Sequence, residues 1–433
     1  AASDVYKRQV QAGMPVPLWE GHPPRGSVMN GKGCLMEGKL VLTRKDSMMR
    51  KRGLSALTIL VGLWALSCSK EGPGVSPTSD SARPNIIFIM SDDHAEQAIS
   101  AYGSKLIQTP NIDRIANEGI RFDNSFVTNS ICAPSRAVLL TGKYSNLNGL
   151  RDNRDEFDGS QVTFPKLLRA AGYETAVVGK WHLKTEPTGF DFWKILIGQG
   201  EYYTPVFKDA AGSSDYPGYV TDLITDFALD FLENRDKEKP FCLLYHHKAP
   251  HRNWMPDVKH LQEYADRDLP LPETFYDDYQ GRVAAGAQDM RIADMYLSMD
   301  MKLHKDYYGE ETGTGGNRNA EVEQSWVGSY DRMSDEQKKA WDEHYGPINE
   351  GYRTANLKGN ELAEWMYQRY IKDYLRCIIS VDENIGRVLD YLDENGLTEN
   401  TLVVYTSDQG FYLGEHGWYD KRFMYEESLS MPL

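Results

Sequence analysis

The chain has 433 residues, of which 41% are hydrophobic and 26% are charged, a composition typical of a protein with a substantial core. Its 48 Lys and Arg residues are outnumbered by 63 Asp and Glu residues, and the formal net charge of −15 argues against general binding to nucleic acid. An anionic substrate stays compatible with this charge, because a pocket is governed by its own local groups.

The beginning of the chain contains the pattern of an export signal. A basic run, Met48–Arg52, precedes the mostly hydrophobic stretch Leu54–Leu66, and Ser67 and Cys68 follow. A basic start, a short apolar middle and a small residue before a cut are typical of signal peptides. The apolar stretch is too short to span a membrane well. We therefore predict a signal peptide over residues 48–68.

The segments on either side of this signal are also not expected to belong to the fold. Residues 65–68, ALSC, resemble a bacterial lipobox, which predicts that Cys68 becomes a lipidated N-terminus; cleavage nearby without a lipid is the alternative. The mature protein would then be periplasmic, or a lipoprotein of the outer membrane or cell surface of a bacterium. Residues 69–83 are rich in Ser, Pro and Gly and predict a flexible tether. Residues 1–47 precede the start at Met48, and we interpret them as a gene-calling artefact.

From residue 84 onward, strand and helix patterns alternate. Apolar runs that fit strands lie at 85–90, 175–178, 241–245 and 402–405, and helical patterns lie at 110–118, 164–171, 222–233 and 362–392. A break in the last helix is predicted near Asp382. This alternation predicts an α/β fold with a mostly parallel central sheet flanked by helices.

Other parts of this region are less regular. Residues 257–360 are polar and weakly periodic, and we expect surface helices and loops that lie over the sheet and contribute to a pocket rim. Cys242 falls within a predicted strand and Cys377 within a helical pattern, so both are expected to be core thiols. No disulfide framework can be derived from the spacing of the five cysteines.

Residues 132–142, CAPSRAVLLTG, combine a reactive side chain with a helix start. Pro134 suits the first turn of a helix, and Gly142 can end it. Cys132 would then lie beside a helix N-terminus, where unpaired backbone N–H groups favour an anion, and Arg136 adds a fixed cation one turn later. Taken alone, Cys132 is more simply interpreted as a buried, inert cysteine.

Oxygen-bearing side chains follow two of the predicted strands. Asp92 and Asp93 come soon after the strand at 85–90, and Asp408 and Gln409 follow the strand at 402–405. In open α/β sheets, ligands bind outside the carboxyl ends of the strands. Adjacent buried carboxylates need a cation, and oxygen donors suit a hard divalent ion such as calcium. A solvated strand end or a helix cap is the alternative interpretation.

Basic side chains follow the two other strands. Lys180 and His182, in GKWH, could hold an anionic oxygen and transfer a proton near neutral pH. The segment HHKAPH contains His246, His247 and His251, which could be interpreted as a transition-metal cluster. The adjacency of the first two and the absence of further Cys or His ligands at suitable spacing weaken that interpretation.

Together these segments resemble the type I sulfatases, which belong to the alkaline phosphatase superfamily. CAPSRAVLLTG matches every fixed position of the family signature C-x-P-S-R-x-x-x-L-T-G, and GKWHL resembles a second family block. The resemblance extends from Asn85 to Lys421 and implies an alkaline-phosphatase-like fold. In the family, more sheet and a smaller C-terminal subdomain usually follow. We therefore expect residues 84–433 to be a sulfatase catalytic domain that is truncated at its C-terminus.

The resemblance also implies two cofactors. A formylglycine-generating maturation enzyme would convert Cys132 into formylglycine, whose hydrated aldehyde is the nucleophile. A calcium ion would lie beside it, with Gln409 in the place of a commoner Asn or His. The implied metal ligands are Asp92, Asp93, Cys132 after its modification, Asp408 and Gln409.

The family positions imply a role for each remaining residue of the site. The sulfate would be held by Arg136, Lys180 and Lys421. His251 would protonate the leaving alcohol, and His182 would help to expel sulfate from the modified residue. The implied catalytic residues are Cys132, Arg136, Lys180, His182, His251 and Lys421, and the predicted substrate-binding residues are Lys248 and His416.

Three function classes remain open at this stage. The first is hydrolysis of sulfate esters, and the second is hydrolysis of a phosphoester or phosphonate by a relative in the same superfamily. The third is a non-catalytic glycan-binding relative on the cell surface. The complete C-A-P-S-R string favours the first. The segments HKAPHRNW and DQGFYLGEHGWYDKRFMYEES most resemble glycan sulfatases, in particular N-acetylglucosamine-6-sulfatases that act on glycosaminoglycans, with other sulfated sugars as the runner-up.

Overall fold

The computed structural model describes residues 83–308 and 318–433, and the side chains of residues 308–324 are not described. The predicted artefact at 1–47, the signal peptide at 48–68 with Cys68, and all but the last residue of the tether at 69–83 therefore lie outside the described residues.

A seven-stranded sheet forms the centre of the described part, in the order β5-β4-β3-β2-β6-β1-β7. The strands from β3 to β7 in this order pair in parallel, whereas β4 and β5 are added as antiparallel strands at one edge. A separate two-stranded sheet joins β8 to β9. The predicted α/β fold with a mostly parallel sheet is confirmed. The strands are β1 Asn85–Ser91, β2 Glu174–Lys180, β3 Phe192–Leu196, β4 Val206–Asp209, β5 Gly212–Asp215, β6 Phe241–His246, β7 Thr401–Ser407, β8 Tyr412–Leu413 and β9 Tyr419–Asp420.

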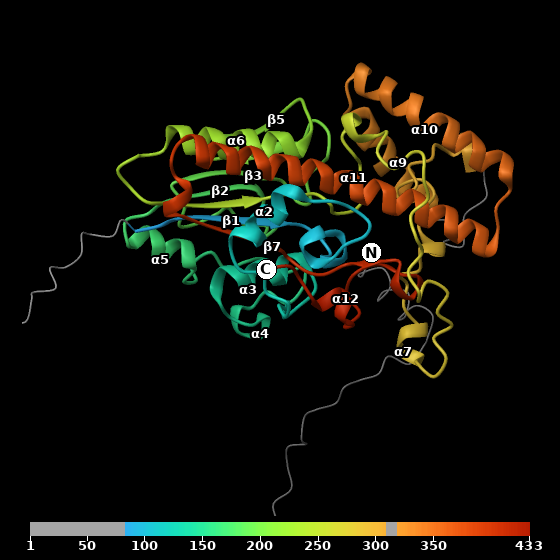
Figure 1. Ribbon diagram of the computed structural model, residues 1–433, viewed down its shortest axis with the longest axis horizontal. Coiled ribbons are helices and arrows are strands. Elements are labelled where there is room, and N and C mark those ends of the chain that lie inside the picture. Colours follow the sequence, from blue (N-terminus) through green and yellow to red (C-terminus); the bar gives the residue numbers. More distant parts are fainter. Residues whose placement is uncertain (1–82, 309–317) are drawn as a thin grey trace, which may run out of the picture. The chain divides into compact units, whose positions relative to one another are not determined.

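Helices cover both faces of the sheet, with α6 and α11 on one side and α3, α4 and α5 on the other (Figure 1). The alternation of side chains along β6 explains why both faces are covered, because Leu243 and Tyr245 belong to one hydrophobic cluster and Cys242 and Leu244 to another. The helices are α2 Pro110–Glu118, α3 Cys132–Thr141, α4 Ser145–Asn148, α5 Phe164–Ala170, α6 Val220–Asn234, α7 Val283–Gly286, α8 Lys305–Tyr308, α9 Arg318–Asp331, α10 Asp335–Ala355, α11 Gly359–Glu394 and α12 Glu426–Leu429. Short 3₁₀ turns are η1 Glu96–Ala98, η2 Ser100–Tyr102, η3 Val258–His260, η4 Ile292–Asp294, η5 Thr398–Asn400 and η6 Glu415–Gly417.

The predicted break near Asp382 is wrong, because α11 runs without interruption from Gly359 to Glu394. The Asp382 carboxylate accepts hydrogen bonds from the backbone N–H groups of Ile112 (2.9 Å) and Asn111 (3.1 Å) in the first turn of α2. Thr109, at the N-cap of α2, makes no capping hydrogen bond of its own. A polar residue on the buried face of one helix therefore caps another helix, which explains why it looked like a break in the pattern.

The prediction that residues 257–360 lie over the sheet is wrong for the part that forms α9 and α10. In Figure 1, α9 and α10 lie beyond the sheet, against the half of α11 that begins at Gly359. Tyr345 of α10 donates a hydrogen bond to Asp373 of α11, and the rings of Trp326 and Trp341 lie 5.7 Å apart. This segment therefore has a buried aromatic core, which a polar and weakly periodic sequence does not reveal.

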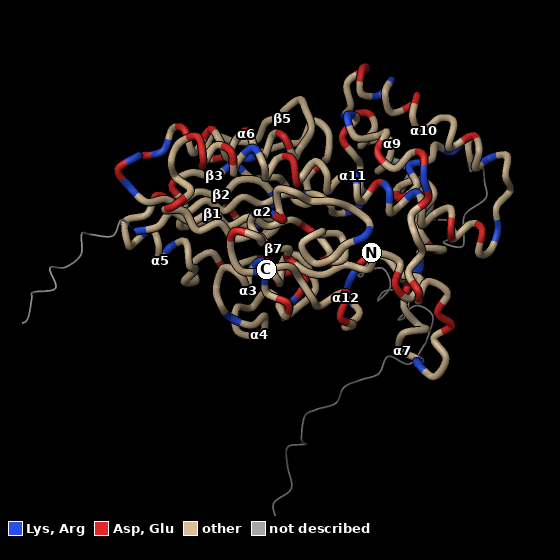
Figure 2. Tube along the Cα trace, viewed as in Figure 1, with Lys and Arg blue, Asp and Glu red and all other residues tan. Residues whose placement is uncertain are grey.

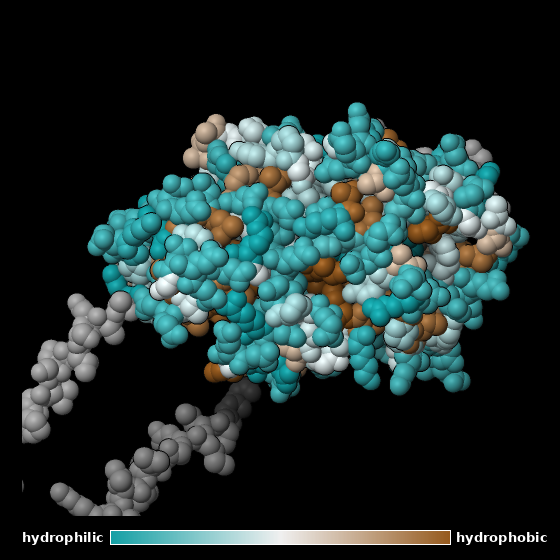
Figure 3. Space-filling view, turned by 45° about the horizontal axis from the view of Figure 1, so that its top comes forward, coloured by the Kyte–Doolittle hydropathy of each residue, from teal (hydrophilic) through white to brown (hydrophobic). Residues whose placement is uncertain are grey.

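Cys242 and Cys377 are buried free thiols, as predicted. Lys and Arg are interspersed with Asp and Glu along the described chain (Figure 2). The face shown in Figure 3 is mostly hydrophilic, with small, separate hydrophobic patches. Within the described ranges, no helix is both long enough and apolar enough to cross a membrane.

Candidate active site

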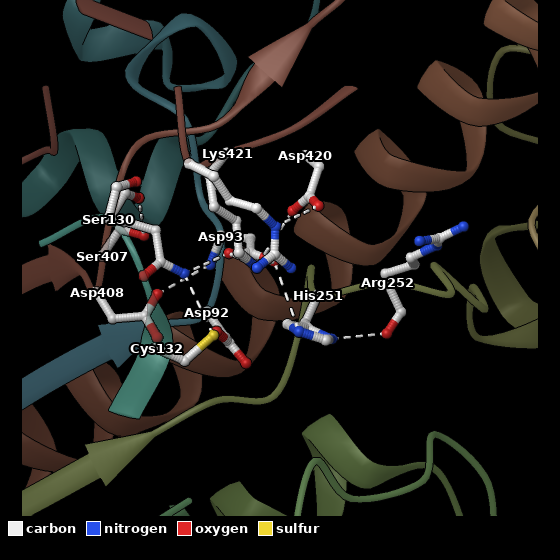
Figure 4. Close-up of polar contacts among 12 residues, drawn as sticks. Asp92, Asp93, Ser130, Cys132, His251, Arg252, Ser407, Asp408, Asp420 and Lys421 are labelled. Atoms are coloured by element: carbon white, nitrogen blue, oxygen red, sulfur yellow. Dashed lines mark hydrogen bonds and ion pairs between the residues drawn. The ribbon is translucent and has the colours of Figure 1, made fainter. Parts of the chain in front are cut away.

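The candidate active site lies at the carboxyl ends of the four adjacent strands β2, β6, β1 and β7. Asp92 follows β1, Lys180 ends β2, and Asp408 follows β7. Cys132 is the first residue of α3, which ends at Gly142 in the left-handed conformation, as the sequence predicts. Figure 4 shows the sulfur of Cys132 beside Asp92, and one ligand atom each of Asp92, Cys132 and His251 lie within 4.8 Å of one another. The fold thus brings these predicted residues together from distant parts of the chain.

Three carboxylates form the centre of the site. Asp92, Asp93 and Asp408 each offer an oxygen, and these oxygens lie within 4.8 Å of one another. Asp408 is held from two sides, because its Oδ2 accepts hydrogen bonds from Nε (3.1 Å) and Nη2 (3.0 Å) of Arg136, and its Oδ1 accepts one from the backbone N–H of Asp93 (3.1 Å). Such a cluster of buried negative charge requires nearby cations.

Two side chains at this site, Asp92 and Gln409, have oxygens that are not hydrogen-bonded within the described residues. Both carboxylate oxygens of Asp92 are buried and accept no hydrogen bond, although they form ion pairs with Lys180 and Arg136. The Oε1 of Gln409 is also buried without a hydrogen bond. Together with Asp93 and Asp408 these atoms make an oxygen-rich donor set, which fits a hard divalent cation.

Lys421 supplies the positive charge next to Asp93. Its Nζ donates to both carboxylate oxygens of Asp93, at 2.7 and 2.6 Å, and both side chains are buried. Burial raises the pKa of Asp93 to about 6, although the neighbouring Lys421 lowers it. Burial also opposes the charged form of Lys421, but Asp93, Cys132 and Asp420 together outweigh that effect and raise the pKa of Lys421 above its usual value. The pair therefore stays ionised near neutral pH.

Cys132 is almost fully buried, with 1% of its surface exposed. Burial raises the pKa of its thiol to about 11, although Lys421 lowers it. The Nε2 of Gln409 lies 3.4 Å from the sulfur. The unmodified side chain would thus be a protonated thiol near neutral pH, which is a poor nucleophile.

The histidines of the HHKAPH segment do not form a common metal site. Nδ1 of His251 donates to the carbonyl oxygen of Arg252 (2.7 Å), which leaves Nε2 facing Asp93 at 3.8 Å. His246 contacts the carbonyl oxygen of Lys180 instead (3.2 Å). Neither ring nitrogen of His247 has a hydrogen-bond partner within the described residues. In the described part of the chain, the groups suited to a metal contain only one of these histidines.

The two candidate proton-transfer residues are both uncharged in this environment. Burial, followed by the charge of Lys180, lowers the pKa of His182 to about 2 and holds the pKa of His251 well below its usual value. His182 adopts a left-handed backbone conformation (φ 56°), and its Nδ1 is buried without a partner within the described residues. An anion bound between these residues and the neighbouring cations would favour the protonated imidazoles.

The two predicted substrate-binding residues differ in their surroundings. Lys248 is buried, with its Nζ 4.5 Å from the centre of the Tyr202 ring, and burial lowers its pKa to about 8. His416 lies in a different cluster, where its Nδ1 is 2.6 Å from Asp277 and its ring is 5.3 Å from Trp418. The role of His416 in substrate binding stays a prediction.

Other residues support the site without having been predicted. Tyr374 of α11 accepts a hydrogen bond from the backbone of Ala95 (2.9 Å) and donates one to the carbonyl oxygen of Asp93 (2.7 Å). The hydroxyl of Ser135 donates to the carbonyl oxygen of Asp408. Ser135 was visible in the CAPSR string, whereas no local signal connects Tyr374 with a residue that lies 281 positions earlier.

Asp420 and Arg422 flank Lys421 and are also new to the site. The Nε of Arg422 donates to Oδ2 of Asp420 at 3.0 Å, and Asp420 lies 3.7 Å from the Nζ of Lys421. Both residues adopt positive φ values, 76° and 93°. Their position beside Lys421 in the sequence was the only signal that could have found them.

Comparisons with known proteins show which family this chain is similar to. The family model described as Sulfatase matches residues 84–433. The chain is 51% identical over 391 residues to the N-acetylglucosamine-6-O-sulfatase of Bacteroides thetaiotaomicron, an alignment that covers 89% of this chain and 68% of that protein. It is 38% identical over 385 residues to the N-acetylgalactosamine-6-O-sulfatase of the same species, covering 85% and 66% of the two chains.

A solved structure is similar over most of the described residues. The structure of BT4656 in complex with its substrate D-glucosamine-2-N,6-O-disulfate has a TM-score of 0.75 and 52% sequence identity to this chain. The match covers 81% of this chain and 70% of that chain. The present chain thus spans about two thirds of the length of these relatives, which agrees with the predicted truncation.

Proposed function

The chain belongs to the sulfatase family and is a sulfuric ester hydrolase. We propose that it removes the 6-O-sulfate from N-acetylglucosamine or glucosamine units of glycosaminoglycans. The observation that carries this proposal is the identity of 51% to an N-acetylglucosamine-6-O-sulfatase, together with the 52% identity to a solved structure that holds D-glucosamine-2-N,6-O-disulfate as its substrate. Other sulfated sugars, including 6-O-sulfated N-acetylgalactosamine, are the runner-up.

The charges of the site support an anionic substrate. Arg136, Lys180 and Lys421 contribute three buried basic side chains around Cys132, and the three carboxylates of the centre balance them. Burial lowers the pKa of Lys180 well below its usual value, whereas its ion pair with Asp92 favours the charged form. A sulfate group bound here would add negative charge, and a divalent cation held by Asp92, Asp93, Asp408 and Gln409 would compensate for it and polarise a sulfate oxygen when bound. We propose calcium as this cation, because the oxygen-only donors of these four side chains match its preference.

We also propose that a maturation enzyme converts Cys132 to formylglycine, and the support for this is the CAPSRAVLLTG string, which matches every fixed position of the family signature. The modified residue would supply a hydrated aldehyde as the nucleophile. The roles of the other residues follow from their positions. Lys180 and Lys421 bind sulfate oxygens, and Arg136 holds Asp408 in place while adding positive charge.

The two histidines are proposed to move protons on opposite sides of the reacting group. His251 is 13% exposed and its Nδ1–H is fixed by the carbonyl oxygen of Arg252, so that Nε2 can carry the proton that the leaving alcohol needs. His182, near Lys180, is proposed to accept a proton from the modified Cys132 when sulfate is expelled. Lys248 and His416 are proposed to contact the sugar.

A panel of sulfated sugars tests this proposal. We expect the enzyme, co-expressed with a maturation enzyme, to release sulfate from 6-O-sulfated N-acetylglucosamine and from glucosamine-2-N,6-O-disulfate faster than from the 3-O-sulfated isomer or from 6-O-sulfated N-acetylgalactosamine. Equal turnover of aryl phosphate and aryl sulfate would favour the phosphoester alternative. Binding of the sugars without release of sulfate by a matured enzyme would favour the non-catalytic glycan-binding alternative.

We further propose that the protein is exported and anchored by a lipid at Cys68. The support for this is the basic and apolar pattern of residues 48–68. Mass spectrometry of the native protein should find a diacylated Cys68 at the N-terminus and no peptide from residues 1–47. The same measurement reports whether residue 132 carries a thiol or an aldehyde.

A further inference from the structure

A second concentration of buried charge lies on the face of α11 that is turned toward α10. Asp373 is completely buried and accepts hydrogen bonds from Lys302 (2.5 Å), Arg376 (3.0 Å) and the hydroxyl of Tyr345 (2.5 Å). Arg369 lies one helical turn earlier, with its Nε 3.5 Å from the same carboxylate. Three buried cations therefore share one buried carboxylate, and this group has an excess of positive charge.

Arg369 is the member of this group whose hydrogen bonds are not satisfied. Only 5% of its surface is exposed, and none of its three guanidinium nitrogens has a hydrogen-bond partner within the described residues. The guanidinium carbon lies 3.6 Å from the centre of the Tyr345 ring, so the planar group is held against an aromatic face. Burying N–H donors of a charged group without acceptors is costly, and since each of these nitrogens is itself buried, an acceptor in the neighbouring space would reach them through a shift of the surrounding side chains.

A cavity of about 660 Å³ adjoins this arginine. Arg369, Arg376 and Tyr345 form part of its wall, together with Trp365 and Gln368. Three carboxylates also line it, but these residues are exposed at the rim, and two of them are engaged: Asp268 with Lys372 (3.2 Å) and Glu364 with the hydroxyl of Tyr276. Of the charged residues that line it, Arg369 and Arg376 are buried, whereas the three acidic residues are exposed.

We propose that this cavity binds an oxyanion, a sulfate or carboxylate group, through the guanidinium of Arg369, with Arg376 adding positive charge. A planar guanidinium with free donors matches the two oxygens of such a group. The anion could be free inorganic sulfate or an acidic group on a sugar, and the aromatic and amide side chains of the wall suit a sugar ring. The site is distinct from the catalytic centre, which α11 contacts through a different residue, Tyr374, whose hydroxyl donates to the carbonyl oxygen of Asp93.

The decisive variant is Arg369→Met, which removes the unsatisfied charge and keeps the length of the side chain. The matched control is Arg387→Met, which changes an arginine of the same helix that pairs with Asp226 at the surface (2.6 Å). Because Lys302 and Arg376 still neutralise Asp373, we expect Arg369→Met to fold and to turn over an aryl sulfate at the rate of the parent enzyme. If Arg369→Met does not fold, Arg369→Lys is used in its place. This variant keeps the positive charge but lacks the planar guanidinium that can bind two oxygens at once.

Crystals of the full chain soaked in selenate, an anomalous analogue of sulfate, should show a peak beside Arg369 in the parent and in Arg387→Met, and none in Arg369→Met. Calorimetric titration with sodium sulfate and with a 6-O-sulfated N-acetylglucosamine disaccharide should show a binding event that weakens at least tenfold in Arg369→Met alone. Binding of the disaccharide only would identify a sugar-borne group, and binding of both would identify free sulfate as sufficient. If neither probe binds in a manner that depends on Arg369, the proposal is overturned.

Discussion

The oxygen-rich centre of the site predicts that a divalent cation stabilises the fold. Asp92, Asp93 and Asp408 offer oxygens within 4.8 Å of one another, and those of Asp92 have no hydrogen bonds within the described residues. A ligand that binds only the folded state at a concentration of 100 Kd raises the free energy of unfolding by about 2.7 kcal/mol. For a folded unit of roughly 340 residues, an unfolding entropy of about 2.1 cal/mol/K per residue converts this into a shift in Tm of about 4 °C.

The assay is thermal unfolding of the purified protein after treatment with a chelator, followed by titration with calcium or with magnesium. We expect Tm to fall on chelation and to be restored by calcium at lower concentrations than by magnesium, because calcium tolerates an irregular set of oxygen ligands. Asp92→Asn should abolish most of the response. The matched control is Asp390→Asn, which alters an exposed carboxylate near Arg114 and should respond like the parent.

Two results would refute this reasoning. The first is a Tm that does not change on chelation and calcium addition, since the cluster would then be neutralised by Arg136, Lys180 and Lys421 alone. The second is an Asp92→Asn variant that responds to calcium as the parent does, which would place the cation elsewhere. For either result to count, the Tm of Asp390→Asn must respond to chelation and calcium as the Tm of the parent does, because this shows that the assay reports a local site.

Three further predictions concern single side chains. Cys132→Ala should abolish sulfate release while Tm stays within a few degrees of the parent. Cys132→Ser should also abolish it, unless a serine-type maturation system acts on that residue. Undiminished activity in Cys132→Ala would contradict the assignment of the nucleophile. His251→Gln should lower turnover of a sugar sulfate by about 10²- to 10⁴-fold and that of an aryl sulfate with an acidic phenol much less, and equal losses would argue against a general acid. Asp382→Ala should lower the free energy of unfolding by about 1–2 kcal/mol in urea titrations, because the first turn of α2 loses its cap, whereas Asp390→Ala should have little effect.

Much of the fold could be predicted because its elements depend on local patterns. The helix expected at 110–118 is α2 with the same bounds, and the four predicted strands lie within β1, β2, β6 and β7. Parallel strands buried on both faces give continuous apolar runs, and their polar ends then identify where a site can form. This explains why Asp92, Lys180 and Asp408 were found and brought together correctly.

The parts that could not be predicted depend on long-range contacts. Asp382 interrupted an apolar pattern, and nothing in the local sequence shows that its carboxylate caps α2, which begins 272 residues earlier at Pro110. Likewise, Arg369 and Asp373 are ordinary charged residues of a helical segment until Tyr345 and Lys302 bury them. Whether a charged residue is buried by contacts with distant parts of the chain cannot be recognised from the spacing of residues in a single sequence.

The helix α11 contacts both the catalytic centre and the cavity at Arg369, through two consecutive residues that point in different directions. Tyr374 holds the carbonyl of Asp93, and Asp373 organises the cations beside the cavity. Any displacement of this helix on binding at one place would change the free energy of binding at the other, and thermodynamic linkage requires the effect to be reciprocal. If an oxyanion in the cavity changes the affinity for a cation at Asp93 by some factor, the cation must change the affinity for that oxyanion by the same factor.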